Sequence, residues 1–320
     1  FNEVAKVYPQ LKKKVNKILT VYNTCGINQD RTEWYSRCIE SIFNQDYETD
    51  IVVSSCMNSR PCLETLKSRF GESLGIIHYP ERYIVNVTFN KTVLIKDLDN
   101  KYDGFFFLDS GVELTDKTSL SQMQERMSTN SMVSLQVDID TGFEPLGFKQ
   151  NSSTAQIVNQ DFKIPLGKGI NLHSQIFSRD ILDTFGLIIP DVFAAYCTES
   201  TFSFLNACVE KEWVIVKDVM AHHNKAVDGP SSSQPHFSPV YRNPWNNLLY
   251  NRNALDFITD ANCISCGLGY EECGNIMMHN QDAYDKGKPK YKQELIDNIK
   301  KYFYSNKTEL DYNDINYESI

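Results

Sequence analysis

The sequence predicts an α/β fold with a largely parallel sheet flanked by helices. Apolar strands and amphipathic helices alternate four times within the first 110 residues. Neighbouring parallel strands need a crossover, which is usually a helix, so this alternation favours helices on both faces of one sheet. The fourth strand holds three aromatic residues and a leucine and stops at Asp109. A charged side chain in that place is typical of a ligand site over the carboxyl ends of the strands.

The first half of the chain has a clear order of elements. The helix at 31–43 is indicated by apolar residues at helical spacing, and the helix at 61–70 by Pro61 in its first turn. The alternation predicts strands at 18–22, 51–53, 75–79 and 104–108 and helices at 31–43, 61–70 and 87–98.

The second half of the sequence predicts further strands and a C-terminal extension. Strands are expected at 131–137, 142–149, 170–177 and 213–220, with helices at 179–185 and after Thr198, while 156–164 has no clear pattern. The expected division of the chain is an N-terminal arm at 1–16, a main domain at 17–227, a flexible loop at 228–239, a helical extension at 240–304 and an acidic, poorly ordered tail at 305–320.

Polar residues follow three of the predicted parallel strands. Tyr22-Asn23, Ser54-Ser55 and Asp109-Ser110 come at the ends of strands one, two and four and are expected to converge at one edge. Asp109 is the first candidate for chemistry. The alternative is an ordinary turn, because Asp, Ser and Gly are also the common turn residues.

Bulk properties exclude several classes of protein. The net charge is −9, and no Lys/Arg block forms the basic stripe that nucleic-acid binding needs. Neither a membrane-spanning apolar run nor a signal-peptide pattern is present in the sequence, and the nine cysteines lack disulfide-framework spacing. We therefore expect reduced thiols, a cytoplasmic location and no nucleic-acid partner.

Several motifs resemble those of GT-A-fold, family-2-type glycosyltransferases. Tyr22-Asn23, the stretch SIFNQDY at 41–47, Asn90 and Phe107-Leu108-Asp109-Ser110 match that family's motifs in order, the last being the start of its DXD element. The resemblance covers about residues 17–225. It implies a mixed GT-A sheet flanked by helices, with a nucleotide-sugar-binding half at 17–115 and an acceptor-binding half at 116–227.

The resemblance also implies a nucleotide-sugar donor, such as a UDP- or GDP-sugar, and a carbohydrate acceptor. The residues it assigns to the donor are Tyr22, Asn23, Ser54, Asn58, Asn90, Asp109 and Ser110. Two positions depart from the family pattern. Gly111 stands where the second acid of the DXD element is expected, and strand two ends in Ser54-Ser55 rather than in the acid that contacts the nucleobase. Asn23 and Asn90 are also compatible with capping or turn roles.

A divalent cation, Mn²⁺ or Mg²⁺, is expected beside the donor diphosphate, because transfer of the sugar leaves charge on that group. Asp109 is the first expected ligand. Glu113 is a candidate substitute for the missing acid, and His222 or His223 resembles the family's late metal-binding histidine. Paired histidines at a strand end are also compatible with a purely structural role, and metal-independent binding remains open.

Glu199, in the segment Thr198-Glu199-Ser200, resembles the family's catalytic base, which implies inverting transfer to an acceptor hydroxyl. The same position is compatible with simple compensation of a helix dipole. Two alternatives stay open for the whole chain: a retaining transferase of the same fold, and a binding or scaffolding module without turnover.

A second possible metal site lies in the C-terminal extension. Cys263, Cys266, Cys273 and His279 have the ligand types of a structural zinc site. A single CxxC pair without a second pair is weak support, so we do not expect zinc there.

Overall fold

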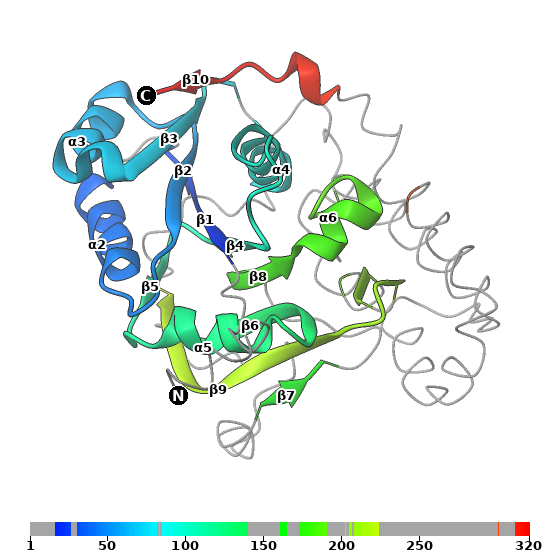
Figure 1. The fold of residues 1–320 in the computed structure, drawn as a ribbon. Helices are drawn as coiled ribbons and strands as arrows, with labels where there is room; N and C mark the ends of the chain where they lie inside the picture. Colours follow the sequence, from blue (N-terminus) through cyan, green and yellow to red (C-terminus); the bar gives the residue numbers. More distant parts are fainter. Residues whose placement is uncertain are drawn as a thin grey trace, which may run out of the picture.

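The computed structural model describes residues 17–26, 31–81, 83, 85–139, 161–164, 173–190, 202, 205–206, 208–223, 300 and 311–320. Within these residues the strands form one ten-stranded mixed sheet in the order β10-β3-β2-β1-β4-β8-β6-β9-β5, with β7 paired to β9 (Figure 1). The predicted arm at 1–16, strand at 142–149, loop at 228–239 and nearly all of the extension at 240–304 lie outside the described residues.

The parallel half of the sheet is the part that the sequence predicts best. β1 is central, and it pairs in parallel with β2 on one side and β4 on the other, while β3 continues the parallel order beyond β2. The four strands are β1 (Ile18–Cys25), β2 (Asp50–Cys56), β3 (Leu74–Tyr79) and β4 (Gly104–Leu108). The predicted parallel arrangement is confirmed.

The other half of the sheet mixes directions. β8 pairs antiparallel with both β4 and β6, whereas β9 runs parallel to β6 and pairs antiparallel with β5 and β7. These strands are β5 (Val112–Leu114), β6 (Asn130–Ile139), β7 (Phe162–Lys163), β8 (Ser174–Ser178) and β9 (Glu212–His223). The short strands β5 and β7 were not predicted, and β9 extends beyond its predicted end to include both histidines.

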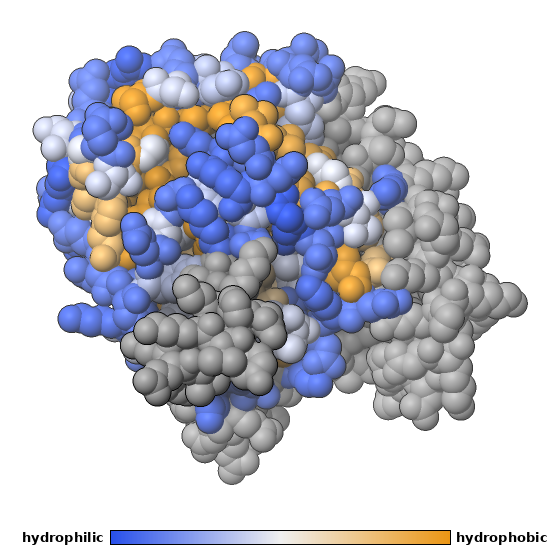
Figure 2. Space-filling model, viewed as in Figure 1, coloured by the Kyte–Doolittle hydropathy of each residue, from blue (hydrophilic) through white to orange (hydrophobic). Residues whose placement is uncertain are grey.

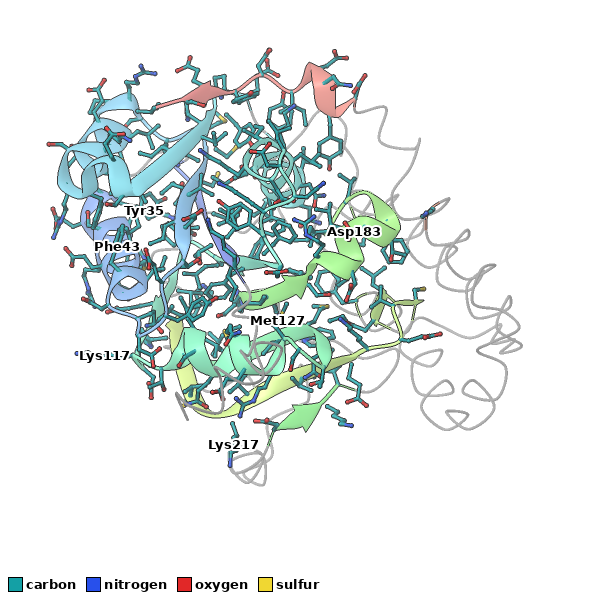
Figure 3. All side chains as sticks on the ribbon, viewed as in Figure 1. Tyr35, Phe43, Lys117, Met127, Asp183 and Lys217 are labelled. Carbon is teal, nitrogen blue, oxygen red and sulfur yellow. The ribbon has the colours of Figure 1, made fainter. Side chains whose placement is uncertain are left out.

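Helices cover both faces of the parallel half. α2 (Thr32–Phe43) and α3 (Arg60–Phe70) lie on one face, and α4 (Val85–Lys96) lies on the other (Figure 1). Tyr35, Ile39 and Ile42 form the buried stripe of α2 that joins the main apolar core, and Figure 3 shows Tyr35 on the α2 side of the sheet. On the opposite face, Phe89 of α4 contacts Phe107 of β4 with ring centroids 5.2 Å apart.

Two further helices pack beside the antiparallel strands. α5 (Ser119–Arg126) was not predicted, whereas α6 (Arg179–Phe185) occupies the predicted range. Gln45, from the SIFNQDY motif, joins the end of α2 to α5, since its Nε2 donates to the carbonyl of Asp116 at 2.9 Å and its Oε1 accepts from the N–H of Leu120 at 3.1 Å. The motif therefore serves to fasten two helices.

The C-terminal residues correct one prediction. Residues 311–320 were expected to be poorly ordered because they are acidic and polar, but they form a 3₁₀ turn, η5 (Tyr312–Asp314), and the strand β10 (Glu318–Ser319), which pairs antiparallel with β3. Ile315 is 3% exposed, and the Arg60 guanidinium lies 2.5 Å from the Glu318 carboxylate. Backbone pairing and one apolar anchor outweigh the polar composition of this segment.

The pairing of β6 with β9 is irregular. Ser134 pairs with Ile215 and Gln136 with Met220, so that β9 advances five residues where β6 advances two. Such an irregularity bends and twists a sheet.

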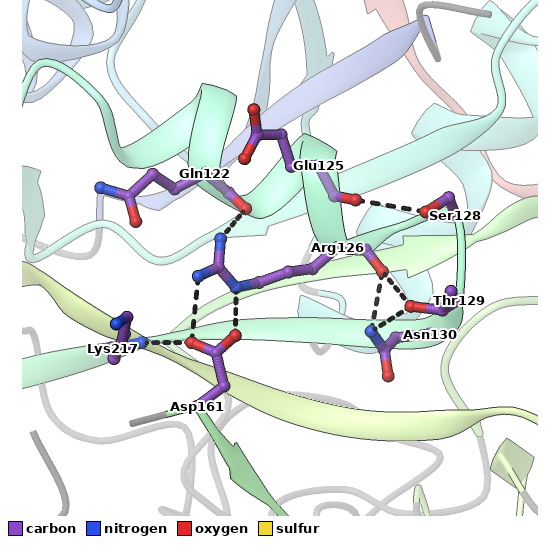
Figure 4. Close-up of polar contacts among 8 residues, drawn as sticks. All are labelled: Gln122, Glu125, Arg126, Ser128, Thr129, Asn130, Asp161 and Lys217. Carbon is purple, nitrogen blue, oxygen red and sulfur yellow. Dashed lines mark hydrogen bonds and ion pairs between the residues drawn. The ribbon is translucent and has the colours of Figure 1, made fainter. Parts of the chain in front are cut away.

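A separate polar contact joins α5 to β9. Arg126 of α5 donates two hydrogen bonds, of 2.7 and 3.1 Å, to the carboxylate of Asp161, which lies next to β7. The backbone N–H of Lys217 on β9 donates to the same carboxylate (Figure 4).

Figure 2 shows the surface from the same side as Figure 1. On this face the outer helices are hydrophilic, and hydrophobic residues show mainly between α3 and α4. In the described part of the chain, no helix combines the length and the apolar character that crossing a membrane requires.

Candidate active site

Asp109 lies at the carboxyl edge of the sheet because β4 ends at Leu108 and the chain then turns. The turn is closed by the N–H of Val112, which donates to the carbonyl of Asp109 at 3.1 Å. The N–H of Ser110 donates to Oδ1 of Asp109 at 2.8 Å. The second carboxylate oxygen, Oδ2, is left to face the neighbouring strands.

Two aromatic side chains hold this turn in place. The hydroxyl of Tyr22 donates to the carbonyl oxygen of Ser110 at 2.7 Å, and Nε1 of Trp34 donates to the same oxygen at 3.0 Å. Tyr22 comes from β1 and Trp34 from α2, so the turn after β4 is fixed from two different elements. Tyr22 and Ser110 were both predicted at the donor site, and the structure brings them into direct contact.

Two histidines join Asp109 at this edge. β8 runs antiparallel to β4, which places His173, the residue before β8, beside Asp109, and the N–H of Asp109 donates to the carbonyl of His173 at 2.9 Å. β9 ends at His223 on the same edge, and the rings of His173 and His223 lie 4.3 Å apart between centroids. Nδ1 of His173 lies 3.3 Å from Oδ2 of Asp109.

The electrostatics of the cluster favour an ionised Asp109. Burial would by itself raise the pKa of this carboxyl group. The hydrogen bond and charge of His173, the charge of His223 and the N–H of Ser110 oppose that effect and hold the pKa of Asp109 below its ordinary value. The carboxylate is thus available as an anionic ligand near neutral pH.

The three side chains fit a divalent cation. One ligand atom from each of Asp109, His173 and His223 lies within 4.8 Å of the other two. Asp109 and His173 keep side-chain exposures of 30% and 18%, so the cluster is open on one side. Carboxylate and imidazole are the ligands that borderline divalent metals take in proteins, and the open side leaves room for further ligands from a substrate.

Glu113 and His222, two of the predicted metal ligands, lie outside this cluster. They face each other as paired residues of β5 and β9, whereas His223 pairs with Val112. Since side chains alternate along a strand, His222 and His223 point to opposite faces of the sheet. The Glu113 carboxylate instead accepts a hydrogen bond from Arg37 at 2.9 Å.

The predicted donor residues of β1 and β2 divide between the two faces of the sheet. Asn23 pairs with Ser54 on one face. Asn23 Nδ2 donates to the carbonyl of Leu108 at 3.2 Å, while Asn23 Oδ1 and Ser54 Oγ are buried without a hydrogen-bond partner among the described residues.

Asn58 belongs to the other face. Its Nδ2 donates to Thr24 Oγ1 and to Ser55 Oγ, both at 2.8 Å. Ser55 in turn lies 3.4 Å from Nδ1 of His78 on β3. Gly26 permits this arrangement, because a Cβ atom there would lie 2.2 Å from Asn58 Oδ1. A polar cluster thus spans the ends of three parallel strands.

Asn90 binds backbone within the protein. Its Oδ1 accepts from the N–H groups of Ile188 and Ile189 at 3.2 and 3.0 Å, and its Nδ2 donates to the carbonyl of Ile189 at 2.8 Å and to the hydroxyl of Tyr312 at 3.1 Å. The side chain is 1% exposed. It fastens α4 to the segment after α6 and to the C-terminal turn.

The remaining predicted residues lie outside the described residues. They are Glu199 and the cysteine and histidine group Cys263, Cys266, Cys273 and His279. His173 is the site residue that sequence reasoning missed. Its signal was its place within the predicted strand at 170–177, which becomes informative only when the antiparallel pairing of β8 with β4 is known.

A separate cavity of about 700 Å³ lies at the opposite, amino-terminal edge of β1, β2 and β3. Phe43 lies in its lining at the end of α2, is 41% exposed and stacks on Phe70 with ring centroids 5.5 Å apart (Figure 3). Neither Asp109 nor the two histidines of the cluster line this cavity, so we place the candidate site at the carboxyl edge.

Comparison with known proteins gives a fold and no sequence relative. No protein-family model and no curated protein sequence matches the chain. Among solved structures, the chain is similar to the mannosyltransferase PcManGT from Pyrobaculum calidifontis, solved with GDP-Man and Mn²⁺, with a TM-score of 0.51 and 12% identity over 90% of this chain and 75% of that one.

Two other solved structures are similar at the same level. GalNAc-T7, solved with UDP, GalNAc and Mn²⁺, matches with a TM-score of 0.54 and 11% identity over 90% of this chain and 59% of that one. TarS from S. aureus, as residues 1–349, matches with a TM-score of 0.50 and 12% identity over 85% of this chain and 74% of that one. The chain thus spans about three fifths to three quarters of the PcManGT and GalNAc-T7 chains and of the TarS fragment, and 43% of the longer TarS chain. The predicted GT-A fold class is confirmed.

Proposed function

We propose that this chain, which has the GT-A fold, is a glycosyltransferase that moves a sugar from a nucleotide-sugar donor to an acceptor hydroxyl. The observation that carries the proposal is the cluster of Asp109, His173 and His223 at the carboxyl edge of the sheet. Ligands bind at this edge in open α/β sheets. PcManGT and GalNAc-T7, which share the fold, were solved with Mn²⁺ together with nucleotide or nucleotide-sugar ligands, and this supports the same class of donor here.

A divalent cation held by the three side chains would neutralise the charge that develops on the leaving diphosphate. Contacts within the chain fix the position of that site. Tyr22 and Trp34 fix the turn through the Ser110 carbonyl, and the Ser110 N–H orients the Asp109 carboxylate. Because these groups are fixed before substrate binds, little reorganisation is needed during transfer.

The nucleoside part of the donor is proposed to lie over β1 and β2, within the half at 17–115. Two groups support this position. Asn58 and its neighbours Thr24 and Ser55 offer a polar cluster at the strand ends. On the other face, Asn23 Oδ1 and Ser54 Oγ have acceptor and donor capacity that no described residue uses. The acceptor is proposed to bind the half at 116–227.

Inverting transfer with Glu199 as the base is the proposed stereochemical course, on the resemblance of Thr198-Glu199-Ser200 to the family motif. A carboxylate there would take the proton of the acceptor hydroxyl as the bond to the anomeric carbon forms. The anomeric configuration of the product, measured by NMR, separates this course from a retaining one.

The function is tested by incubating the protein with UDP-, GDP- and TDP-sugars, with and without Mn²⁺, and measuring released nucleotide. Release from one donor, dependent on the cation and lost in Asp109→Asn, is the expected result. Binding of a nucleotide, seen as a thermal shift, without turnover on any donor and acceptor would favour a binding module. Neither turnover nor a thermal shift with any nucleotide would contradict the proposal.

A further inference from the structure

We propose that the cavity at the amino-terminal edge of β1, β2 and β3 is a second ligand site, which binds a small phosphate monoester with Lys96 and Lys101 on its phosphate group. The cavity measures about 700 Å³, within the usual range of small-molecule sites. None of the three residues of the candidate active site lines it, so the proposal goes beyond the glycosyltransferase function and does not depend on it.

The amine of Lys96 lacks a partner. Lys96 ends α4 and lines the cavity, is partly buried, and makes no hydrogen bond or ion pair with any described residue. Burial and the positive charges of Lys101 and Lys67 lower the pKa of this amine, and the charge of Asp50 opposes them only in part. A partly buried ammonium group without an acceptor is unfavourable, and an anion in the cavity would relieve that cost.

Gly75 of β3 makes room for this amine. A Cβ atom at Gly75 would lie 3.3 Å from Nζ of Lys96 and 3.5 Å from Cγ2 of Val52, so the amine lies over the backbone of β3. Gly75 is not among the glycines of the described chain that have a positive φ, so its backbone conformation does not require glycine. Glycine inside a strand often marks the close approach of a ligand or of another group.

Lys101 and Lys17 add positive charge near Lys96. Their amines lie 3.7 and 3.1 Å from the same oxygen, Oδ2 of Asp50, which also accepts a 2.6 Å hydrogen bond from the hydroxyl of Tyr102. Three ammonium groups therefore share one carboxylate, which leaves an excess of two positive charges. A phosphate monoester carries about 1.5 to 2 negative charges at pH 7, so its charge matches this end of the cavity.

The other charged groups that line the cavity are acids. Glu72 is paired with Lys67 at 3.7 Å. Asp46 accepts a 2.9 Å hydrogen bond from the hydroxyl of Ser121, whereas Glu48 makes no hydrogen bond or ion pair with a described residue. Carboxylates accept hydrogen bonds from hydroxyl groups and repel further negative charge. We therefore expect a monoester whose organic part carries hydroxyl groups, rather than a diphosphate.

Aromatic rings give the cavity apolar surface. Phe43, Tyr47 and Tyr102 all belong to its lining, and Figure 3 shows Phe43 on α2. In small-molecule sites such rings pack against the carbon atoms of the ligand, while a few polar groups fix its orientation.

The experiment measures binding of glucose 6-phosphate, inorganic phosphate and glucose by calorimetry at low ionic strength. In parallel, the reaction of each lysine with an acetylating reagent is followed by mass spectrometry, with and without ligand. Lys96→Met removes the amine and retains the length of the side chain. Gly75→Val keeps every charge and fills the space over β3.

Two control variants test the place of binding. Lys163→Met removes an exposed lysine of β7, which is paired with Glu212 and does not line the cavity. Asp109→Asn alters the candidate active site and leaves the cavity unchanged. Far-UV circular dichroism establishes that each variant is folded.

We expect glucose 6-phosphate to bind with a Kd below about 1 mM and more tightly than inorganic phosphate, and glucose not to bind. Lys96→Met and Gly75→Val should each weaken binding by about tenfold or more, since both remove a charge-assisted hydrogen bond to the phosphate. The ligand should protect Lys96 and Lys101 from acetylation and leave Lys163 reactive. Lys163→Met and Asp109→Asn should bind like the wild type.

Absence of glucose 6-phosphate binding to the wild type, or unchanged affinity in folded Lys96→Met, would overturn the proposal. If Lys96→Met does not fold, Gly75→Val decides in the same way. Loss of binding in Asp109→Asn would place the ligand at the candidate active site, and equal affinity for inorganic phosphate would mean that a bare anion binds; both results would overturn the proposal. Sugar transfer is not measured in this experiment, so the two proposals can fail separately.

Discussion

The hydroxyl of Tyr22, within β1, donates a 2.7 Å hydrogen bond to the carbonyl oxygen of Ser110, in the turn that carries Asp109. Burial, with smaller contributions from Cys38 and Tyr35, raises the pKa of Tyr22 well above its ordinary value, so the phenol stays protonated and keeps its proton to donate. The central strand thereby holds the turn at the candidate site.

Tyr22→Phe removes this donor and leaves the Ser110 carbonyl with Trp34 alone. We expect a loss of about 1 kcal/mol in the free energy of unfolding, measured by urea denaturation, and weaker Mn²⁺ binding. Tyr317→Phe, at a tyrosine that is 42% exposed, is the matched control and should change neither. Unchanged metal affinity in Tyr22→Phe would show that the turn does not need this anchor.

Asn90→Ala should act on stability rather than on donor binding. It leaves the N–H groups of Ile188 and Ile189 and the carbonyl of Ile189 without their partner in a buried place. Each such group costs about 1–3 kcal/mol, so we expect a loss of about 3 kcal/mol or more in urea denaturation.

The exposed Asn316→Ala, which removes a contact to Glu81, is the control and should cost under about 0.5 kcal/mol. If Asn90→Ala has the same urea midpoint of unfolding as the wild type but fails to bind nucleotide, Asn90 belongs to the donor site, as the family resemblance implies.

The parallel strands and the order of the first half were predictable because their apolar runs are long and their helices are amphipathic. Asp109 could be placed for the same reason, as the residue that ends a buried strand. The short strands β5, β7 and β10 could not, since two or three residues carry no period and form only because a partner strand is already present.

The candidate metal ligands could likewise be predicted only in part from the sequence. A choice between His222 and His223 depends on which face of β9 each occupies, and this follows from the register with β5, where His223 pairs with Val112. His173 comes to Asp109 through an antiparallel pairing across 64 residues, which no local pattern encodes. Asn90 was predicted to bind the donor, with a capping or turn role as the alternative, but the backbone it holds lies about a hundred residues away in sequence.

Deleting residues 311–320 should destabilise the sheet and make the protein associate. The deletion removes the buried Ile315 and leaves the edge of β3 without β10. An uncovered edge strand offers free N–H and C=O groups to another molecule. We expect a lower Tm by calorimetry and a concentration-dependent shift in size-exclusion chromatography.

Glu318→Ala is the matched control for that deletion. It removes the ion pair with Arg60, in which both side chains are more than half exposed, but keeps the backbone pairing. Its effect should be under about 1 kcal/mol. A deletion variant that stays monomeric with the wild-type Tm would show that β10 contributes nothing to the fold.

Asp161→Asn tests the contact shown in Figure 4 through its pH dependence. Burial would raise the pKa of Asp161, but the hydrogen bond from Arg126, the N–H of Lys217 and the two positive charges bring it below its ordinary value. The group therefore stabilises the fold above the unfolded pKa of about 3.9, and this contribution is lost as the pH falls through the lower folded pKa.

We expect Asp161→Asn to lower Tm at pH 7 and to flatten the decline of Tm between about pH 5 and pH 2. Lys217→Ala retains the backbone N–H that contacts Asp161 and should keep most of the wild-type profile. Parallel Tm profiles of Asp161→Asn and the wild type across this range would contradict the assignment.

Glu199→Gln should abolish sugar transfer while leaving nucleotide binding unchanged, because the amide cannot accept the acceptor's proton. The measurement is product formation beside the nucleotide dissociation constant, with the exposed Glu125→Gln as the control. Transfer at the wild-type rate in Glu199→Gln would remove Glu199 as the base and favour a retaining course.

The connection between β4 and β5 has a consequence for the whole sheet. Three residues, 109–111, join these strands, so their facing ends lie within about 14 Å. Three other strands, β8, β6 and β9, stand between them in the sheet order, which in a flat sheet would separate β4 from β5 by about 19 Å.

The sheet must therefore curl back on itself, and the irregular pairing of β6 with β9 provides the bend that this curl requires. His173, just before β8, and His223, at the end of β9, then meet Asp109 where the curl closes. An ion bound there would join the two sides of the curl and, at a hundredfold excess over its dissociation constant, stabilise the curled sheet by about 2.7 kcal/mol.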